Sequence, residues 1–401
     1  MTQAHSHKKR VLVVGGGFGG IKAALALESA ERFAITLLSN SPNFQYNPSL
    51  YHTATGGLAV QSNIPLSRIF EGKSVTLEQG EALQLDREAK AVKTSDGRTF
   101  PYDILVLALG MTTNYFGIKG LAEHSYGIKS VHEAERFKAH LHQQLIDEGK
   151  PDLNYIIVGG GPTGIELAGA LPGYLRRIMQ AHNVKHRAVH ISLVEAAPHL
   201  VPRMPKRMGK AIERQLRRLG IKLHLGKAVQ GETADALMVD GKPLPSHTVV
   251  WTAGQANAPF FKANSFTLTE RGKVAVNEYL QAEPDIYVIG DNNNTMYSGM
   301  AQTALYDGNF VAKNLIRASE HKQPYPYKPK KPIYVLPAGP RWAAVLWGKV
   351  QLYGWLGWVL RSLADLRGFT DVEPWWRATE QWMTEFGGQE DCPVCASHPE
   401  G

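Results

Sequence analysis

The sequence predicts an α/β protein with two separate parallel sheets, each covered by helices, followed by a C-terminal tail of different character. Two glycine-rich turns predict the two sheets, because each turn follows an apolar strand and precedes a helical pattern. The turns are 11-VLVVGGGFGG-20 and 154-NYIIVGGGPTGIELAGAL-171. The tail is set apart by tryptophan, since seven of the eight tryptophans lie between residues 342 and 382.

The first turn has the spacing of a Rossmann-like dinucleotide-binding turn, G-x-G-x-x-G. Its glycines let the backbone approach a pyrophosphate, and the free N–H groups at the helix start bind the phosphates. The next strand, 33–38, ends at Ser39 instead of the usual acidic ribose ligand, so a hydroxyl replaces a carboxylate. A glycine-rich turn in an ordinary α/β protein is the alternative. The predicted dinucleotide contacts are Gly15, Gly17, Phe18, Gly19, Gly20 and Ser39.

The second turn repeats the spacing and adds the carboxylate that the first lacks. The strand 190–195 ends in Glu195, and no arginine follows at once, which favours NADH over NADPH. Pro172 is expected to kink the following helix or to end it early. The predicted contacts are Gly159, Gly161, Pro162, Thr163, Gly164 and Glu195.

Two such turns predict two dinucleotides, one a tightly held flavin and the other an exchanging nicotinamide. A third short strand, in 285-DIYVIGDNNN-294, ends at Gly290 and Asp291. The Asp291 carboxylate is well placed for the ribityl hydroxyls of FAD, although it can also be an ordinary turn aspartate.

The order of the motifs predicts a flavin domain that is split by an inserted domain. Within the insertion, Ser130 and Glu133 form a capping box at the start of a helix. The segment 321-HKQPYPYKPKKP-332 reads as a linker. The predicted organisation is FAD domain 8–115, NADH domain 116–250, FAD domain 251–320, linker 321–332 and tail 333–401.

Composition excludes several classes of protein. The 401 residues carry a net charge of +8, which favours an anionic partner, but no nucleic-acid-binding signature follows. The N-terminus is not a signal peptide. The only cysteines are Cys392 and Cys395, which fits a reducing compartment. Together with His398 they resemble half of a zinc site, but a redox dithiol and an inert tail are the alternatives. We predict no metal.

The tail is too polar to span a membrane as a simple helix. Its longest apolar run, 352–360, has nine residues, whereas a spanning helix needs about 20. We expect a helix over 342–361 that lies in the membrane interface, because residues 326–370 carry a net charge of +6 and residues 371–401 a net of −6. A helical hairpin packed on the FAD domain or a dimer interface is the alternative.

A second basic region lies in the predicted NADH domain. The run 203–222 has eight basic residues and one acidic residue. It is a solvated helix face, a surface that steers anionic NADH, or a surface that rests on acidic lipid.

In this order, the motifs resemble the flavoproteins with two dinucleotide-binding domains, and among them the type II NADH dehydrogenases. The resemblance covers residues 10–320, about four-fifths of the chain. It departs from the family at Leu109, Tyr306 and Asp307. The matching stretches are 11-VLVVGGGFGG, 44-FQYNPSLYHTATGG-57, 102-YDILVLALGMTTNYFGI-118, 157-IVGGGPTGIELAGAL-171, 249-VVWTAG-254, 287-YVIGD-291 and 301-AQTALYDGNFVAKNL-315.

The resemblance implies an FAD-dependent NADH:quinone oxidoreductase that works by a ping-pong hydride transfer and pumps no protons. It implies a homodimer on the cytoplasmic face of the cell membrane, docked peripherally on acidic lipid through the tail. Glu166 is expected at the flavin–nicotinamide junction, with a helix cap or buried network as its alternative. Gln302 and Tyr306 are expected on the quinone side. Further cofactor contacts implied in this way are Pro48, Gly110, Gly254, Gly290, Asp291, Ala301 and Gln302.

Other functions stay open at this point. Sulfide:quinone oxidoreductases and disulfide reductases of this fold need redox cysteines beside the flavin, and residues 1–391 contain none. A flavoprotein with a non-quinone acceptor, or a silent NADH-binding sensor or scaffold, is the remaining alternative.

Overall fold

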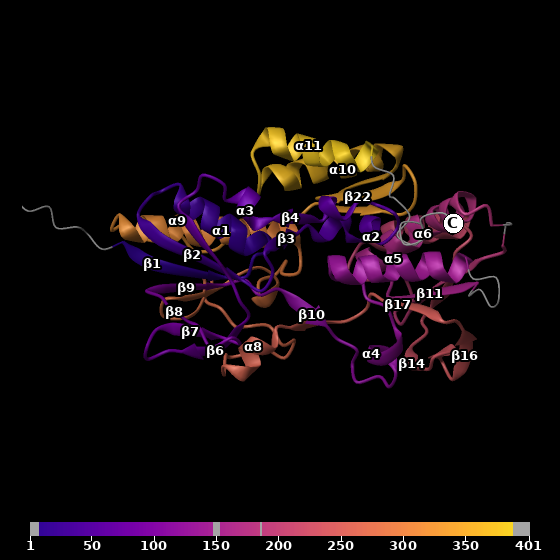
Figure 1. Cartoon of the computed structure of the whole chain (residues 1–401), viewed down its shortest axis with the longest axis horizontal. Coiled ribbons are helices and arrows are strands. Elements are labelled where there is room, and N and C mark those ends of the chain that lie inside the picture. The colour runs from indigo at the N-terminus through magenta and orange to yellow at the C-terminus, as the bar shows by residue number, and fades with distance from the viewer. Residues whose placement is uncertain (1–7, 147–152, 185–186, 388–401) are drawn as a thin grey trace, which may run out of the picture.

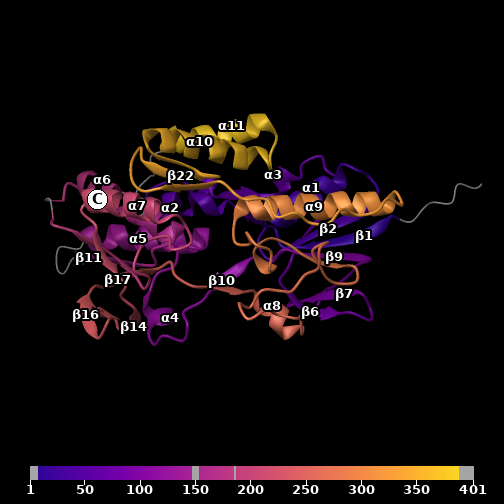
Figure 2. The ribbon, with the colours of Figure 1, turned by 180° about the vertical axis from the view of Figure 1, so that it is seen from behind.

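Two parallel sheets lie side by side, and the tail covers one face of the pair (Figures 1 and 2). The computed structural model describes residues 8–146, 153–184 and 187–387. In Figure 1 the N-terminal strands lie to the left, the second sheet to the right, and the yellow tail above both. This arrangement confirms the α/β fold predicted from the two glycine-rich turns.

The first sheet has six strands in the order β19-β20-β9-β1-β2-β5, and only β19 runs antiparallel. Its central strands are apolar runs buried on both faces, as parallel sheets require. Helices α1 and α9 pack together on one face, and a three-stranded meander with α8 covers the other. The elements are β1 (Lys9–Val14), α1 (Phe18–Glu28), β2 (Phe33–Ser39), β5 (Val75–Gln79), β6 (Ala82–Asp86), β7 (Ala91–Thr94), β8 (Thr99–Pro101), β9 (Ile104–Leu107), α8 (Pro259–Ala263), β19 (Gln281–Glu283), β20 (Ile286–Val288) and α9 (Ala301–Ser319).

The second sheet has four parallel strands in the order β13-β12-β11-β17. The capping box of α5 is present, because Glu133 N–H donates to Ser130 Oγ over 3.1 Å and Ser130 N–H donates to Glu133 Oε2 over 3.1 Å. The elements are α4 (Leu121–His124), α5 (Val131–Ile146), β11 (Asn154–Val158), α6 (Pro162–Ala181), β12 (His190–Glu195), α7 (Lys206–Arg218), β13 (Lys222–Leu225), β14 (Val229–Glu232), β15 (Ala236–Val239), β16 (Lys242–Pro245) and β17 (Thr248–Trp251).

The expected early end of the helix at Pro172 is wrong. Helix α6 continues through Pro172 to Ala181. Both Pro172 and its neighbour Leu171 are buried, and the helix packs on α5, α7 and the tail strand β21 (Tyr334–Pro337). Tertiary packing therefore outweighs the hydrogen bond that proline removes.

The chain crosses between the two sheets twice, and the crossing segments pair with each other. Strand β10 (Met111–Thr113) leaves the first sheet and β18 (Gln255–Asn257) returns to it, as an antiparallel pair. A second small pair, β3 (Asn43–Gln45) with β4 (Asn63–Pro65), frames a loop that packs on helices α5 and α6 of the second domain. This loop contains the turn Asn47–Ser49, the helix α2 (Leu50–Thr53) and the turn Ala59–Gln61, and it is followed by α3 (Leu66–Ile69).

The tail begins as a small antiparallel sheet, so the helix expected over 342–361 is wrong in its first half. Strands β21, β22 (Ala343–Trp347) and β23 (Val350–Gly354) form the sheet, and helices α10 (Trp355–Thr370) and α11 (Trp375–Gly387) follow. Gly348, with φ of +62°, makes the two-residue hairpin turn between β22 and β23. The turn at Gly348-Lys349 thus divides the run 342–361, which composition alone suggests to be one helix, into two strands and the start of α10.

Apolar and ionic contacts fix the tail to the first domain. Phe369 on α10 is buried and stacks on Tyr46, with ring centroids 4.2 Å apart. Lys22 Nζ lies 3.0 Å from Asp371 Oδ1, and Arg68 Nε lies 2.7 Å from Glu373 Oε1. Among the described residues, no helix is both long enough and apolar enough to cross a bilayer.

We predict that Phe369→Ala lowers the free energy of unfolding by about 3–5 kcal/mol, because it leaves a cavity under α10. Leu363→Ala on the same helix is the control, since Leu363 is 51% exposed and is expected to change stability by less than about 0.5 kcal/mol. Urea denaturation of both variants measures the difference. Equal values for the two would contradict the packing described here.

Candidate functional site

The first glycine-rich turn fits a dinucleotide pyrophosphate. A Cβ at Gly15 would lie 2.2 Å from the carbonyl oxygen of Ala108, and one at Gly20 would lie 1.9 Å from that of Gly15. The first approach brings the end of β1 next to the end of β9, and the second packs helix α1 closely on the end of β1. A Cβ at Gly17 would meet no described atom within 4 Å, so this glycine faces open space at the start of α1. The helix N-terminus there offers N–H groups to phosphate oxygens.

Phe18, Gly19 and Ser39 complete this turn. Phe18 is buried and packs edge-on against Phe44, with centroids 4.9 Å apart, while Gly19 lies next to it in the first turn of α1. Ser39 is buried at the end of β2, and its Oγ lies 2.6 Å from the position of a Cβ on Gly16. A short hydroxyl therefore lies where the sequence predicts the ribose contact.

The second turn has the same geometry and a carboxylate. A Cβ at Gly164 would lie 1.9 Å from the carbonyl oxygen of Gly159, whereas one at Gly161 would meet no described atom within 4 Å. Glu195 accepts hydrogen bonds from Gly160 N–H at 2.5 Å and Ala197 N–H at 2.7 Å. Its carboxylate is thus fixed beside the turn, where it can accept ribose hydroxyls. Pro162 and Thr163 form the first turn of α6.

Asp291 lies where two strands of the first sheet end. It follows β20 in a short turn, Gly290–Asn292, and burial raises its pKa, while the charges of Lys273 and Lys129 act in the opposite direction. The Asn292 side chain joins this turn to Gly110, accepting from Gly110 N–H at 2.9 Å and donating to its carbonyl at 2.6 Å. Gly110 and Asp291 therefore meet at the carboxyl ends of β9 and β20, where α/β sheets bind ligands.

Asp307, a departure from the resembled family, supports the same turn from α9. Its buried carboxylate accepts from Gly290 N–H at 3.0 Å, from Asn293 Nδ2 at 2.9 Å and from Tyr327 OH at 2.6 Å. Burial raises the pKa of Asp307 to about 6. This carboxylate ties the 290–293 turn to the 321–332 segment, so Asp307 has a structural task at the position where the chain departs from the family.

Glu166 is a partly exposed residue near the start of α6, and the charge of Arg361 in the tail helix α10 acts on it. Arg361 on α10 pairs with Asp365 one turn later, and its Nη2 donates to the Pro48 carbonyl at 3.1 Å. Tyr46 OH donates to Asp365 Oδ1 at 3.1 Å. Burial raises the pKa of Glu166 to about 8, and the Arg361 charge acts in the opposite direction. The Pro48 loop, the second glycine-rich helix and the tail therefore meet at one place.

Gln302 and Tyr306 contact the segment that leads into the tail. Gln302 Nε2 donates to the Ile333 carbonyl at 2.9 Å, and Ile333 N–H donates back to Gln302 Oε1 at 3.1 Å. Tyr306 OH donates to the Lys328 carbonyl at 3.1 Å. Both side chains thus hold the backbone of residues 328–333, and their expected role toward quinone stays a prediction. Ala301 begins the same helix, and Gly254 lies before β18.

The structure offers no metal centre among the residues it describes, since no group of three or more His, Cys, Asp or Glu side chains gathers there. The sequence motif of Cys392, Cys395 and His398 lies outside the described residues.

Comparison with known proteins shows which family has this arrangement of motifs. Residues 9–308 match the pyridine nucleotide-disulphide oxidoreductases. The chain belongs to this family. Within the family it is similar to the type II NADH:quinone oxidoreductase of Staphylococcus saprophyticus, 28% identical over 332 residues that cover 77% of this chain and 82% of that protein. The type II NADH:quinone oxidoreductase of Staphylococcus aureus is 28% identical over 334 residues, with the same coverage of 77% and 82%.

Solved structures of the family share the fold. NDH2 of Plasmodium falciparum in complex with NADH matches with a TM-score of 0.85 at 15% identity, covering 95% of this chain and 98% of that one. The sulfide:quinone oxidoreductase of Aquifex aeolicus matches with a TM-score of 0.78 at 19% identity, covering 93% and 92%. The resemblance to type II NADH dehydrogenases inferred from the motifs is confirmed, and so is an oxidoreductase fold for flavin and pyridine nucleotide.

Sequence reasoning did not find Arg361, Asp365 and Tyr46. The sequence does contain part of the pattern expected for a buried ion pair, because Arg361 follows a nine-residue apolar run and an acidic residue stands four positions later. An opposite charge at that spacing lies on the same helix face, and a pair within an apolar segment is a candidate for burial. Which loop the pair touches depends on long-range packing that the sequence does not display.

We predict that Gly164→Ala raises the dissociation constant for NADH at least about tenfold, because its Cβ forces α6 away from β11 and distorts the second turn. Gly173→Ala in the same helix is the control, since a Cβ there would meet no described atom within 4 Å. Fluorescence titration with NADH measures both variants, and the flavin spectrum reports the separate first turn. Unchanged NADH binding by Gly164→Ala would contradict the assignment of this turn.

Proposed function

We propose that this protein is an FAD-dependent NADH:quinone oxidoreductase that works by a ping-pong route at the membrane surface. The observation that carries the proposal is the meeting of Pro48, Glu166 and the buried Arg361–Asp365 pair beneath the tail. Glu166 lies on the helix that begins at the second glycine-rich turn, and Arg361 lies on the tail, which carries many exposed apolar side chains. An acceptor that arrives from a bilayer would enter there.

The residues of the first turn fit FAD, and those of the second fit NADH. Gly17 and the start of α1 would hold the FAD pyrophosphate, and Asp291 would bind the ribityl hydroxyls. When bound, FAD accepts a hydride from NADH and passes two electrons on. Glu195 supports NADH over NADPH, because its carboxylate binds free ribose hydroxyls and repels a 2′-phosphate.

Glu166 is our proposed source of a proton for the acceptor. Reduction of a quinone to a quinol takes up two electrons and two protons. With a pKa of about 8, the Glu166 carboxyl is largely protonated at neutral pH and can donate one of them. The other proton arrives with the two electrons in the hydride that NADH supplies, so the overall reaction needs only this one further proton. Arg361 limits how far burial raises the pKa, because its positive charge favours the carboxylate.

The tail supplies the proposed membrane contact. Of the 13 large apolar side chains that are exposed among the described residues, eight lie between Trp347 and Met383. Trp375 and Trp376 are exposed by 71% and 57%. Tryptophan prefers the interface between headgroups and acyl chains, so this surface suits peripheral docking. The proposal includes a homodimer on the cytoplasmic face of the cell membrane, which the family resemblance supports.

Half-reactions test this function. We expect anaerobic NADH to bleach the flavin absorbance of the purified holoprotein and a soluble quinone to restore it. If NADH bleaches the flavin but quinone does not reoxidise it, the electron acceptor is another partner. If NADH does not bleach the flavin, the dehydrogenase assignment is contradicted and a scaffold is favoured.

The pH dependence of the second half-reaction tests Glu166. We predict that the rate of reoxidation by quinone falls as the pH rises through about 8, because the protonated carboxyl is lost. Glu166→Gln should be about a hundredfold slower and lack this inflection. Glu135→Gln, at an exposed position of α5, is the control. An unchanged inflection in Glu166→Gln would contradict the role of Glu166.

A further inference from the structure

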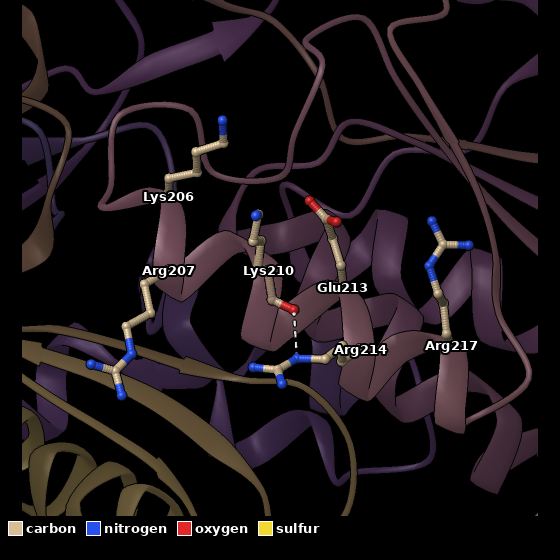
Figure 3. A pocket seen from close by; sticks show the side chains of 6 residues that line it. All are labelled: Lys206, Arg207, Lys210, Glu213, Arg214 and Arg217. Atoms are coloured by element: carbon tan, nitrogen blue, oxygen red, sulfur yellow. Dashed lines mark hydrogen bonds between the residues drawn. The ribbon is translucent and has the colours of Figure 1, made fainter.

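Helix α7 presents an exposed row of cations that the proposed reaction does not use. Its buried face, formed by Met208, Ile212 and Leu216, packs in the core of the second sheet. Its outer face carries the basic side chains, which with Glu213 line a shallow depression (Figure 3). The exposed cations of α7 are Lys206, Arg207, Lys210, Arg214, Arg217 and Arg218.

Six cations against the single carboxylate of Glu213 give the described part of this helix a net positive charge. Among the described residues, no ion pair includes any basic side chain of α7. Arg214 Nε donates to the Lys210 carbonyl of its own helix, at 3.3 Å. Like charges at this spacing repel one another and destabilise the isolated helix. An anionic partner would remove that repulsion.

The basic face lies beside the tail. Helix α7 packs against β22, and Figure 2 shows it next to α6 near that strand. Just beyond its end, Leu219 Cδ1 comes within 2.6 Å of where a Cβ on Gly339 would lie, in the turn between β21 and β22. In Figure 3, the Arg207 and Arg214 side chains extend toward the gold ribbons of the tail. Their charges also act on Tyr353 of β23.

The hairpin next to α7 carries exposed apolar side chains. Trp347 and Val350, which flank its turn, are exposed by 60% and 56%, and Lys349 lies between them. The surface thus passes from cations on the second domain to aromatic and aliphatic side chains on the tail. In an interfacial protein, apolar side chains enter the acyl boundary while neighbouring cations contact anionic headgroups.

We propose that the outer face of α7 binds the anionic headgroups of the membrane on which the tail docks. This inference rests on the proposed membrane docking, and it adds a second contact that comes from the NADH domain. The two contacts would fix the orientation of that domain over the bilayer. Docking would then be salt-sensitive through α7 and salt-resistant through the exposed apolar side chains of the tail.

Vesicle flotation of the full holoprotein tests the proposal. The vesicles are phosphatidylcholine alone, or phosphatidylcholine with about a third phosphatidylglycerol. We expect the triple variant Arg207→Gln, Lys210→Gln, Arg214→Gln to bind the anionic vesicles at least about tenfold more weakly than wild type. Its binding to the neutral vesicles should not change. At about 0.5 M salt the wild type should lose at least this increment, because salt also screens the cations of the tail.

A matched control removes three cations from the opposite side of the molecule. Lys93, Lys242 and Lys262 are exposed on β7, β16 and α8, which lie below the sheets in Figure 1 whereas the tail lies above. Their triple change to Gln should alter anionic binding less than about twofold. Thermal melting checks that both triple variants are folded.

Three results would overturn the proposal. The α7 variant could bind anionic vesicles as the control variant does, which would make this face an ordinary solvated one. The variant could instead raise only the KM for NADH with a soluble quinone, which would assign α7 to steering of the substrate. Wild-type protein that binds neither vesicle would refute the proposed docking as well. Trp375→Ser with Trp376→Ser separates the two claims, because it should weaken binding to both vesicles.

Discussion

The buried pair Arg361–Asp365 is the interaction on which the arrangement of the site depends. The two residues are 8% and 2% exposed, and their polar contacts include the Pro48 carbonyl and Tyr46 OH. Breaking one partner of such a pair typically costs about 3–5 kcal/mol, because the other charge stays buried. The pair therefore fixes α10 over the loop of the first domain and places a positive charge near Glu166 on the second. One contact thus relates the tail, the Pro48 loop and helix α6.

The two glycine-rich turns share a backbone and differ in charge. Each has a helix N-terminus and an open second glycine, which suits a pyrophosphate. The first has the small hydroxyl of Ser39 where the second has the carboxylate of Glu195. In the first domain, carboxylates gather instead at the end of β20, where Asp307 supports the Asp291 turn through Gly290. The difference suits a permanently held flavin in one turn and an exchanging nucleotide in the other.

The local elements were predictable because their signals are local. The strand–turn–helix units at Gly15 and Gly159 follow from apolar runs and glycine spacing, and the capping box of Ser130 and Glu133 follows from two residues. Prediction failed where contacts between distant segments determine the local structure. Helix α6 passes through Pro172 because its flanks are buried, and the tail folds into a hairpin because Gly348 turns the chain. The contacts of Arg361, Tyr46 and Asp307 join segments far apart in sequence, so neither the hydrophobic periodicity nor the composition of the sequence reveals them.

Amide hydrogen exchange tests most directly whether the buried pair fixes the site. The comparison is between wild type and Asp365→Asn, with the exposed change Leu363→Ala as control. We predict at least about tenfold faster exchange in Asp365→Asn at residues 46–54, and faster exchange at the start of α6, because the uncompensated Arg361 loosens α10 from both. Exchange that stays at the wild-type rate in both segments would show that the pair does not hold the tail, the loop and the helix together.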